Sequence, residues 1–295
     1  MMTKVGSGKY TYELIKDWAK LPAGETFAMV SAVATDSQNK VYVFQRKDPP
    51  IVIFDTDGSF LGSWGDGNFV SPHGFYIAND EVYLTDRDSS VAIKYTLDGK
   101  PLLILGQHGV HSDTGCEVPQ ELAPRSAGPF NYPTEMVVAP SGDIYVSDGY
   151  RNARVHRFSS DGTLISSWGE PGKVAPNEFH LPHSMIVGQD ERVYVCDREN
   201  SRVQIFSAEG EFISMWTDML KPFDISQDSD GAFYINESDG SGQGLPPQVS
   251  VFDSDGNILA RWEDSASAHG SWVDANGDIY MARGAAEALD KYVRV

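Results

Sequence analysis

Short apolar runs separated by turn residues recur along the whole chain with a period of about 40 residues. Each repeat holds four runs rich in Val, Ile, Tyr and Phe, which are the residues that favour strands. An Asp-Gly or Glu-Gly pair precedes the last run in five copies, at Asp57-Gly58, Asp98-Gly99, Asp161-Gly162, Glu209-Gly210 and Asp255-Gly256. Such a pair between two apolar runs predicts a tight β-hairpin. We therefore predict four short antiparallel strands in each repeat.

The repeat occurs five times in full and once in part, over residues 30–65, 71–106, 131–169, 181–216, 221–262 and 267–295. The fifth copy has a longer inner loop, and the sixth lacks its final strand. The segment YTYELIKDW, residues 10–18, resembles the last strand of the other copies. Four strands in about 40 residues are typical of a β-propeller blade. We predict that residues 1–295 form one all-β, six-bladed β-propeller, whose ring is closed by an N-terminal strand in the last blade, so that no edge stays open.

Two copies carry a motif of the form Asp-x-x-Asn-x-Arg-Val, clearest at Ser147–Val155 and Cys196–Val203. This motif resembles the NHL repeat. Its acidic and amide residues are expected to cap turns, because Asx side chains satisfy the main-chain groups of turns. The residues concerned are Asp148, Asn152, Asp197 and Asn200.

The net charge of -19 excludes some classes of partner. A protein this acidic repels phosphate backbones and anionic lipids, so we expect neither nucleic-acid nor membrane binding. No apolar run approaches the ~20 residues that span a bilayer, and the first 22 residues lack the apolar core of a signal peptide. The two cysteines, Cys116 and Cys196, define no disulfide framework. The sequence thus predicts a cytoplasmic protein.

Three of the seven histidines occupy matching places, in SPHGF, LPHSM and SAHGS. His73, His183 and His269 each precede the first strand of blades two, four and six, and first strands line the channel of a propeller. Alternate blades of a six-fold ring are related by a three-fold operation, so the three imidazoles should converge. That is the arrangement of a tri-histidine zinc site with a fourth position open to water or substrate, although imidazole ligation also suits iron, cobalt or manganese. Otherwise, the three histidines are polar caps at the channel mouth.

The remaining histidines do not share this register. His108, His111 and His180 are expected in loops, and His156 on a strand surface.

The ends of the second strands should return to the mouth that holds the histidines. Arg46 aligns there with Tyr150, and Arg87 aligns with Arg198 one position earlier. Guanidinium groups beside a cation, in so acidic a protein, predict a small anionic substrate that bears a carboxylate. In the other interpretation Arg87 and Arg198 form ion pairs with their acidic neighbours, and for Arg87 we favour this one.

The stretches PLLILG, PSGDIYVSDGYRN, SSWGE and DRENSRVQIF resemble the lyase domain of peptidylglycine α-amidating monooxygenase, that is, peptidyl-α-hydroxyglycine α-amidating lyase. The resemblance runs from about Val30 to Tyr280 and is most specific between Phe130 and Phe206. It implies a catalytic zinc on the three histidines already singled out. It also implies that Arg46 is an active-site arginine, Tyr150 an essential tyrosine and Arg198 a second arginine.

The chain departs from this family in several places. Gly270 follows the third histidine where the family has an acidic residue that also binds calcium, so the case for Ca²⁺ is weak. The other calcium ligands implied by the resemblance are the main-chain carbonyls of Val33 and Phe75. The family's disulfide cysteines are replaced, by Asn131, Arg151, Tyr194 and Ile205. Their absence agrees with a reducing compartment.

The resemblance implies a zinc-dependent carbon–nitrogen lyase that cleaves an N-acyl-α-hydroxyglycine to an amide and glyoxylate. Tyr150 is the candidate base, and Arg46 or Arg198 would hold the carboxylate. Two alternatives stay open. One is a metal-dependent hydrolase or lyase that acts on another small carboxylated substrate. The other is a non-catalytic NHL propeller that presents its face to a protein or ligand.

Overall fold

The computed structural model describes residues 4–238 and 244–295. The chain forms two compact units, one made of Met1–Asn68 with Phe223–Val295 and the other of Phe69–Pro222. The longer inner loop predicted for the fifth repeat falls in part on residues 239–243, which lie outside the described residues.

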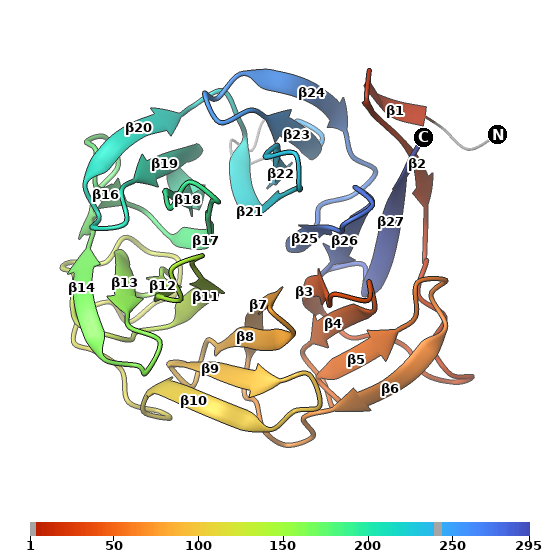
Figure 1. The fold of residues 1–295 in the computed structure, drawn as a ribbon. Coiled ribbons are helices and arrows are strands. Elements are labelled where there is room, and N and C mark those ends of the chain that lie inside the picture. The colour runs from red at the N-terminus through yellow and green to blue at the C-terminus, as the bar shows by residue number, and fades with distance from the viewer. Residues whose placement is uncertain (1–3, 239–243) are drawn as a thin grey trace. The chain divides into compact units, whose positions relative to one another are not determined.

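The unit formed by Phe69–Pro222 contains three antiparallel four-stranded sheets, each built from strands consecutive in sequence (Figure 1). The first sheet comprises β7 (Pro72–Ala78), β8 (Glu81–Asp86), β9 (Val91–Thr96) and β10 (Pro101–Gly106). The second comprises β11 (Pro133–Val138), β12 (Ile144–Asp148), β13 (Arg154–Phe158) and β14 (Leu164–Trp168). The third comprises β17 (Pro182–Val187), β18 (Val193–Asp197), β19 (Arg202–Phe206) and β20 (Phe212–Trp216).

The other unit also contains three sheets (Figure 1). Two of them have four strands, namely β3 (Val30–Thr35), β4 (Val41–Gln45), β5 (Ile51–Phe54) and β6 (Phe60–Trp64), and β21 (Lys221–Gln227), β22 (Phe233–Ser238), β23 (Gln248–Phe252) and β24 (Ile258–Glu263). The third has five strands in the order β1-β2-β27-β26-β25, with bounds Lys4–Ser7, Tyr10–Ile15, Ala288–Arg294, Ile279–Arg283 and Gly270–Val273.

The predicted fold class is confirmed: the protein is an all-β, six-bladed β-propeller. The predicted closure is also present, because β2 from the N-terminus pairs antiparallel with β27 near the C-terminus, with Tyr12 opposite Arg294. Strand β1, which the repeat did not predict, adds a fifth strand at the outer edge of this sheet. The described residues contain one helical element, a 3₁₀ turn at Arg198–Asn200.

The outermost strand of a blade is less buried than the inner strands. Every residue of β3, β11 and β17 is buried, because these strands pack against the first strands of neighbouring blades within their own unit. The outer strands alternate less regularly and are half exposed. The predicted hairpins are present, and the glycine of each Asp-Gly or Glu-Gly pair has φ between 85° and 88°, a conformation that glycine adopts without steric cost.

Large aromatic side chains fill the spaces between adjacent blades. Trp168 at the end of β14 lies 5.9 Å from Phe206 of the next blade, measured between ring centroids, and 6.2 Å from Tyr145 of its own. In the other unit Trp262 packs on Tyr12, with centroids 5.3 Å apart. Trp168 and Trp262, which occupy matching places in their blades, therefore serve packing.

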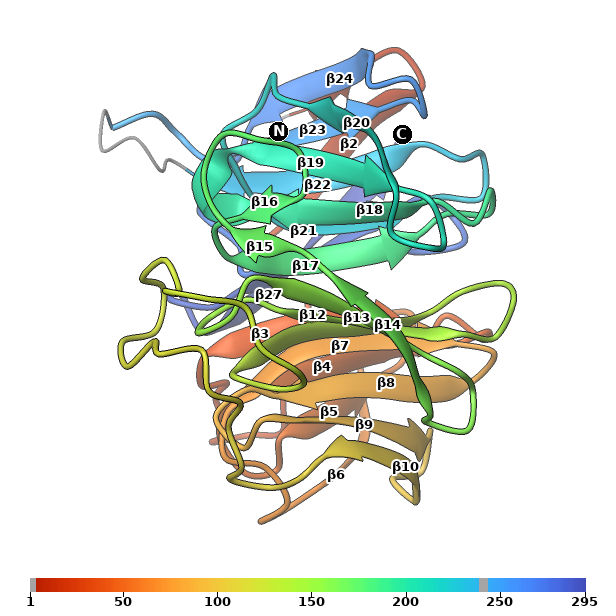
Figure 2. The ribbon, with the colours of Figure 1, turned by 90° about the vertical axis from the view of Figure 1, so that its left-hand side faces the viewer.

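The first three strands of the blade β17–β20 lie side by side in Figure 2, which also shows the connections that leave these sheets. Residues 107–132, between β10 and β11, form a long irregular loop. A short parallel pair, β15 (Glu170–Pro171) with β16 (Glu178–Phe179), precedes β17. None of the described residues forms a helix that is long and apolar enough to cross a membrane.

The closing strand should contribute much of the stability of its blade. Tyr12 has no exposed surface, packs on Trp262 and hydrogen-bonds Tyr234 at 3.3 Å. We expect Tyr12→Ala to lower the free energy of unfolding by about 3–5 kcal/mol, as truncation of a buried aromatic side chain does. Urea unfolding measures this value. Lys4→Ala, at an exposed position of β1, is the matched control and should change it by less than about 0.5 kcal/mol; equal effects of the two variants would contradict the role of β2.

Candidate active site

Three residues singled out by the sequence meet in the unit Phe69–Pro222. His73 in β7 and His183 in β17 are each 2% exposed, and a ring nitrogen of one lies within 4.8 Å of a ring nitrogen of the other. The Tyr150 hydroxyl lies 3.2 Å from Nε2 of each imidazole. Tyr150 follows β12, so one residue from each of three consecutive blades contributes to this group.

Buried carboxylates at the ends of second strands hold the chain that leads into these histidines. Asp86 ends β8 and accepts main-chain N–H groups from Val70 at 2.9 Å and Ser71 at 2.7 Å. Asp197 ends β18 and accepts the N–H of His180 at 2.8 Å. In both blades the main chain is therefore held in place by a carboxylate two or three residues before the histidine. Asp148 makes the same contact with the N–H of Asn131 at 2.9 Å, so the structural role predicted for the motif's aspartates is confirmed.

Two of the histidines share a second feature, a hydrogen bond from Nδ1 to a main-chain carbonyl. In one unit Nδ1 of His73 lies 2.7 Å from the carbonyl oxygen of Thr134, and in the other Nδ1 of His269 lies 2.7 Å from that of Ser31. A carbonyl oxygen only accepts, so Nδ1 carries the proton and Nε2 of the neutral ring keeps a lone pair. Histidines that ligate metals typically have this arrangement.

His269 and Arg46 meet within the other unit. The main-chain N–H of His269 donates to the carbonyl oxygen of Ala282 at 2.8 Å. Arg46 follows β4 and donates from Nε to the Ser31 hydroxyl at 3.2 Å, and the carbonyl of the same serine accepts from His269. Ser31 therefore orients both predicted residues of this unit.

In the last blade, the residue that anchors the segment before the histidine is an arginine instead of an aspartate. Arg283, at the end of β26, occupies the place that a carboxylate has in the other unit, and it is 1% exposed. It bonds Asp264 at 2.7 Å and 2.9 Å and also the carbonyl oxygen of Ala266. The segment that precedes His269 is thus anchored through a buried ion pair.

Two guanidinium groups face the Tyr150 ring. Their central carbons lie 4.8 Å from its centroid for Arg87 and 5.6 Å for Arg198, within the range of cation–π attraction. The predicted ion pairs are also present: Arg87 Nε donates to Asp88 at 2.5 Å, and Arg198 Nε donates to Glu199 at 2.9 Å. The ion-pair interpretation of both arginines is therefore confirmed, and their contact with an anionic substrate stays a prediction.

The charges beside Arg198 are balanced within the protein. Burial would raise the pKa of Glu199, but its ion pairs with Lys221 and Arg198 hold that pKa below the ordinary value. Burial likewise disfavours the charged form of Arg87, whereas Asp88 and the Tyr150 phenol raise its pKa. The net effect raises the pKa of Arg87, so this guanidinium stays charged at neutral pH.

Sequence reasoning missed three contributors to this site. The carbonyls of Thr134 and Ser31 act through the main chain, which leaves no mark in the side-chain pattern. Gln120 lies in the long loop, donates its N–H to the Tyr150 carbonyl at 2.8 Å and accepts from Arg198 at 3.3 Å. A loop of this length in a compact fold is itself a signal of function.

Glycine directly follows two of the histidines, at points where the main chain passes close to a carbonyl of a neighbouring strand. A side-chain carbon at Gly270 would lie 2.8 Å from the carbonyl oxygen of Ser31, and one at Gly74 would lie 2.3 Å from that of Thr134. An acidic residue at position 270 would therefore push away the carbonyl that orients His269. Val33 and Phe75, the carbonyls proposed for calcium, lie in β3 and β7, and Ca²⁺ binding there stays a prediction.

The prediction for His156 is wrong. This residue is completely buried instead of lying on a strand surface. Its Nδ1 lies 2.7 Å from the Ser167 hydroxyl, and its Nε2 lies 3.5 Å from the Asp148 carboxylate. The hydrogen bond at Nδ1 and the carboxylate near Nε2 offset part of the cost of burying the imidazole.

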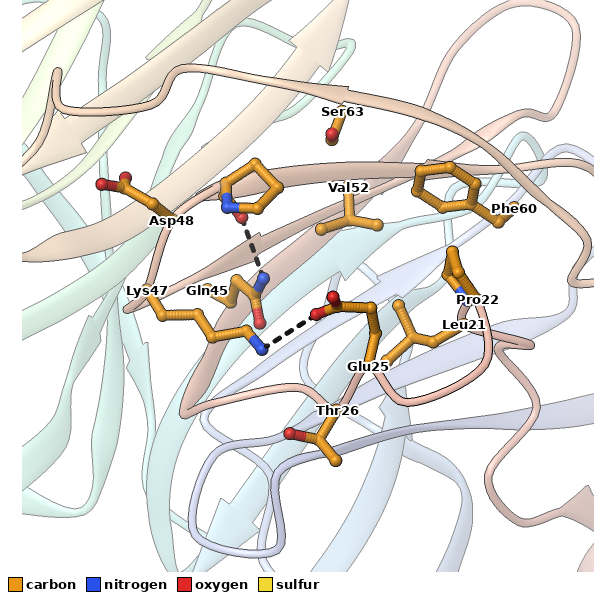
Figure 3. Close-up of a pocket in the computed structure, with 11 residues that line it drawn as sticks. Leu21, Pro22, Glu25, Thr26, Gln45, Lys47, Asp48, Val52, Phe60 and Ser63 are labelled. Atoms are coloured by element: carbon orange, nitrogen blue, oxygen red, sulfur yellow. Dashed lines mark hydrogen bonds and ion pairs between the residues drawn. The ribbon is translucent and has the colours of Figure 1, made fainter.

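A pocket of about 350 Å³ lies in the unit that contains Arg46 (Figure 3). Its lining combines apolar side chains with the ion pair of Lys47 and Glu25, whose charged atoms are 3.7 Å apart. Gln45 and Lys47 contribute to the pocket, whereas Arg46 between them bonds Ser31. None of the predicted site residues is among the residues that line it, so this pocket is separate from the histidine group.

Comparison with known proteins identifies the family. The family model described as NHL repeat matches residues 130–158 and 179–206. NHL repeat-containing protein 3 of Homo sapiens is 32% identical over 312 aligned positions, which cover 97% of this chain and 85% of the relative. The chain therefore belongs to the NHL repeat family.

A second relative carries the name of an enzyme. Peptidyl-alpha-hydroxyglycine alpha-amidating lyase 1 of Drosophila melanogaster is 34% identical over 188 positions, which cover 59% of this chain and 32% of the relative. Among solved structures, a gluconolactonase from Xanthomonas campestris superposes with a TM-score of 0.69 at 15% identity, covering 98% of this chain and 94% of that one. The likeness to this structure shows the fold alone.

The anchor ahead of His183 can be tested by removing one carboxylate. Asp197 has no exposed surface and also accepts from Arg202 at 2.8 Å. Asp197→Ala leaves a buried guanidinium unpaired, so we expect the free energy of unfolding to fall by about 3–5 kcal/mol. Thermal and urea unfolding measure the loss. Asp161→Ala, which removes an acid from an exposed hairpin turn, should cost about 1 kcal/mol or less; a similarly small cost for Asp197→Ala would contradict the anchoring role.

Proposed function

We propose that the protein is a zinc-dependent carbon–nitrogen lyase that cleaves an N-acyl-α-hydroxyglycine, or a closely related carbinolamide, to an amide and glyoxylate. The observation that carries this proposal is the Tyr150 hydroxyl between Nε2 of His73 and Nε2 of His183. The name of the Drosophila relative supports the same reaction class. The substrate is small and bears a carboxylate, which agrees with arginines at the site of an otherwise acidic protein.

The metal would be held by three imidazoles. His73, His183 and His269 are proposed to hold the ion through one ring nitrogen each. The donors suit the ion, because the Nδ1 protons of His73 and His269 are committed to carbonyl oxygens and each Nε2 keeps its lone pair. Neutral imidazole is a preferred ligand of Zn²⁺, and three protein ligands leave a fourth position for substrate.

When bound, the zinc ion supplies Lewis-acid catalysis, which makes the substrate hydroxyl more acidic. Tyr150, in its deprotonated form, is placed to accept the proton of the substrate hydroxyl at its phenolic oxygen. As that proton leaves, the C–O bond of the substrate becomes a carbonyl, the C–N bond breaks and its electron pair goes to the amide nitrogen. Tyr150 then returns the proton to that nitrogen, so the two products balance the substrate and no water is consumed.

The arginines stabilise the negative charges that take part in this reaction. The guanidinium of Arg198 faces the Tyr150 ring and favours negative charge on its oxygen. Arg46, oriented by Ser31, is proposed to receive the substrate carboxylate, since a guanidinium offers a planar fork to two oxygens. The site thus separates the group that takes a proton from the groups that hold the anion.

Metal content tests the first part of the proposal. We expect the purified protein to hold one divalent transition-metal ion per chain, and His183→Ala to lose it because one of three ligands is gone. Elemental analysis after dialysis measures both. His108→Ala, in an exposed part of the loop between β10 and β11, is the control and should keep the ion. Retention of a full equivalent by His183→Ala would refute the ligand assignment.

The role of Tyr150 is tested by Tyr150→Phe, which removes one oxygen and keeps the ring. We expect turnover to fall at least about a hundredfold, the usual contribution of a general base, with metal content unchanged. Glyoxylate release from N-benzoyl-α-hydroxyglycine measures turnover. Tyr145→Phe is the control, because its hydroxyl lies in a blade interface and donates to the Ala208 carbonyl. Full activity in Tyr150→Phe would exclude the phenol as the base.

A non-catalytic NHL scaffold is the second candidate. It is favoured by the human relative, whose name states no activity and which aligns with 97% of this chain. The two functions make different demands on the histidines, because a scaffold requires no metal at that position. A protein that binds no stoichiometric ion and releases no glyoxylate would support the scaffold.

A further inference from the structure

Arg87 is the guanidinium nearest to the Tyr150 ring, yet the reaction described above gives it no part. It follows β8, and its main-chain N–H donates to the Ser71 carbonyl at 3.0 Å, two residues before His73. Its central carbon also lies 5.7 Å from the ring centroid of Tyr132. The guanidinium therefore lies within cation–π range of two aromatic rings, one of which bears the hydroxyl that both imidazoles contact.

The charge of Arg87 is less compensated than that of Arg198. The Arg198 side chain is 5% exposed, and it contacts both Glu199 and Gln120. Arg87 is 17% exposed, and the carboxylate that it contacts, Asp88, takes its Nε edge. A guanidinium has a second edge, formed by its two terminal nitrogens, which matches a carboxylate. The central carbon of Arg87 lies 4.8 Å from the Tyr150 ring centroid, and the Tyr150 phenol contributes to raising the pKa of Arg87.

We propose that Arg87, in addition to Arg46, binds the carboxylate of the substrate and makes the site selective for an anionic compound. This inference rests on the proposed function, because it names a substrate contact of the same site. Asp88 fixes the Nε edge and the aromatic rings fix the plane, so the terminal nitrogens are oriented before the anion arrives. An oriented donor pair loses little side-chain entropy on binding, which favours affinity.

A substrate pair isolates this contact. N-benzoyl-α-hydroxyglycine carries the carboxylate, and N-benzoyl-α-hydroxyglycinamide replaces it with a neutral amide of similar size. With the metal-loaded protein we expect Arg87→Gln to raise KM for the acid about 10- to 100-fold, the usual effect of losing a charge-assisted pair, with kcat changed less than about threefold. KM for the amide should stay within about twofold of the wild-type value.

Two further variants control the experiment. Arg157 in β13 also lies over a tyrosine, at 5.8 Å from the Tyr145 centroid, and pairs with Asp143 at 2.6 Å, but it is remote from Tyr150 in the sheet register. Arg157→Gln should leave KM for both compounds unchanged. Arg87→Lys keeps the charge without the fork and should recover part of the affinity for the acid. It also tests the proposal if Arg87→Gln does not fold.

The outcomes separate this inference from the proposed function. Equal effects of Arg87→Gln on acid and amide, or no effect on either, would overturn the carboxylate contact. If the wild-type protein releases neither glyoxylate from the acid nor glyoxylamide from the amide, the lyase proposal fails, and calorimetric titration with glyoxylate then tests Arg87 directly. Binding to the wild type that Arg87→Gln loses supports the inference, whereas equal binding, or no binding to the wild type, overturns it.

Discussion

The hydrogen bond from an imidazole Nδ1 to a main-chain carbonyl of a neighbouring strand is the constraint on which the site depends. It is 2.7 Å long at both His73 and His269, and it decides which ring nitrogen keeps a lone pair. The acceptors, Thr134 and Ser31, belong to first strands that are buried along their full length. The inner strands therefore do more than hold the histidines in place. A main-chain carbonyl of one strand selects the tautomer of the histidine that it contacts.

The electrostatics of the site oppose those of the whole chain. The protein has a net charge of -19, but Tyr150 lies against two arginines. Each arginine has an acidic neighbour in sequence, which holds the guanidinium in place and offsets the cost of burying it. The buried charges that anchor the histidines differ in kind: Asp86 and Asp197 anchor through N–H groups, and Arg283 anchors through Asp264. The last residue of a second strand can therefore be an aspartate or an arginine, provided that the group it contacts differs accordingly.

Sequence reasoning reached the fold because the repeat is periodic in two respects, the spacing of apolar runs and the Asp-Gly turns, and both are local. It also identified His73, His183 and Tyr150, since matching places in different blades become neighbours once the strands are aligned. It could not find the contacts that depend on a main-chain carbonyl or on an irregular loop, as those of Thr134 and Gln120 do. It misplaced His156, because the alternation of a buried strand does not reveal whether a polar residue has partners inside. For Arg87 it predicted the ion pair with an acidic neighbour but not the contact with the Tyr150 ring, since stacking depends on the side-chain conformation of both partners.

The central claim is that His73, His183 and His269 ligate one metal ion. X-ray absorption spectroscopy of the zinc-loaded protein tests it most directly, because the scattering pattern counts imidazole ligands. The account predicts three imidazole nitrogens at about 2.0–2.1 Å with a further light ligand, and loss of this zinc signal in the His269→Ala variant, which should release the ion as His183→Ala does. A spectrum with sulfur ligands, or one that His269→Ala leaves unchanged, would contradict it.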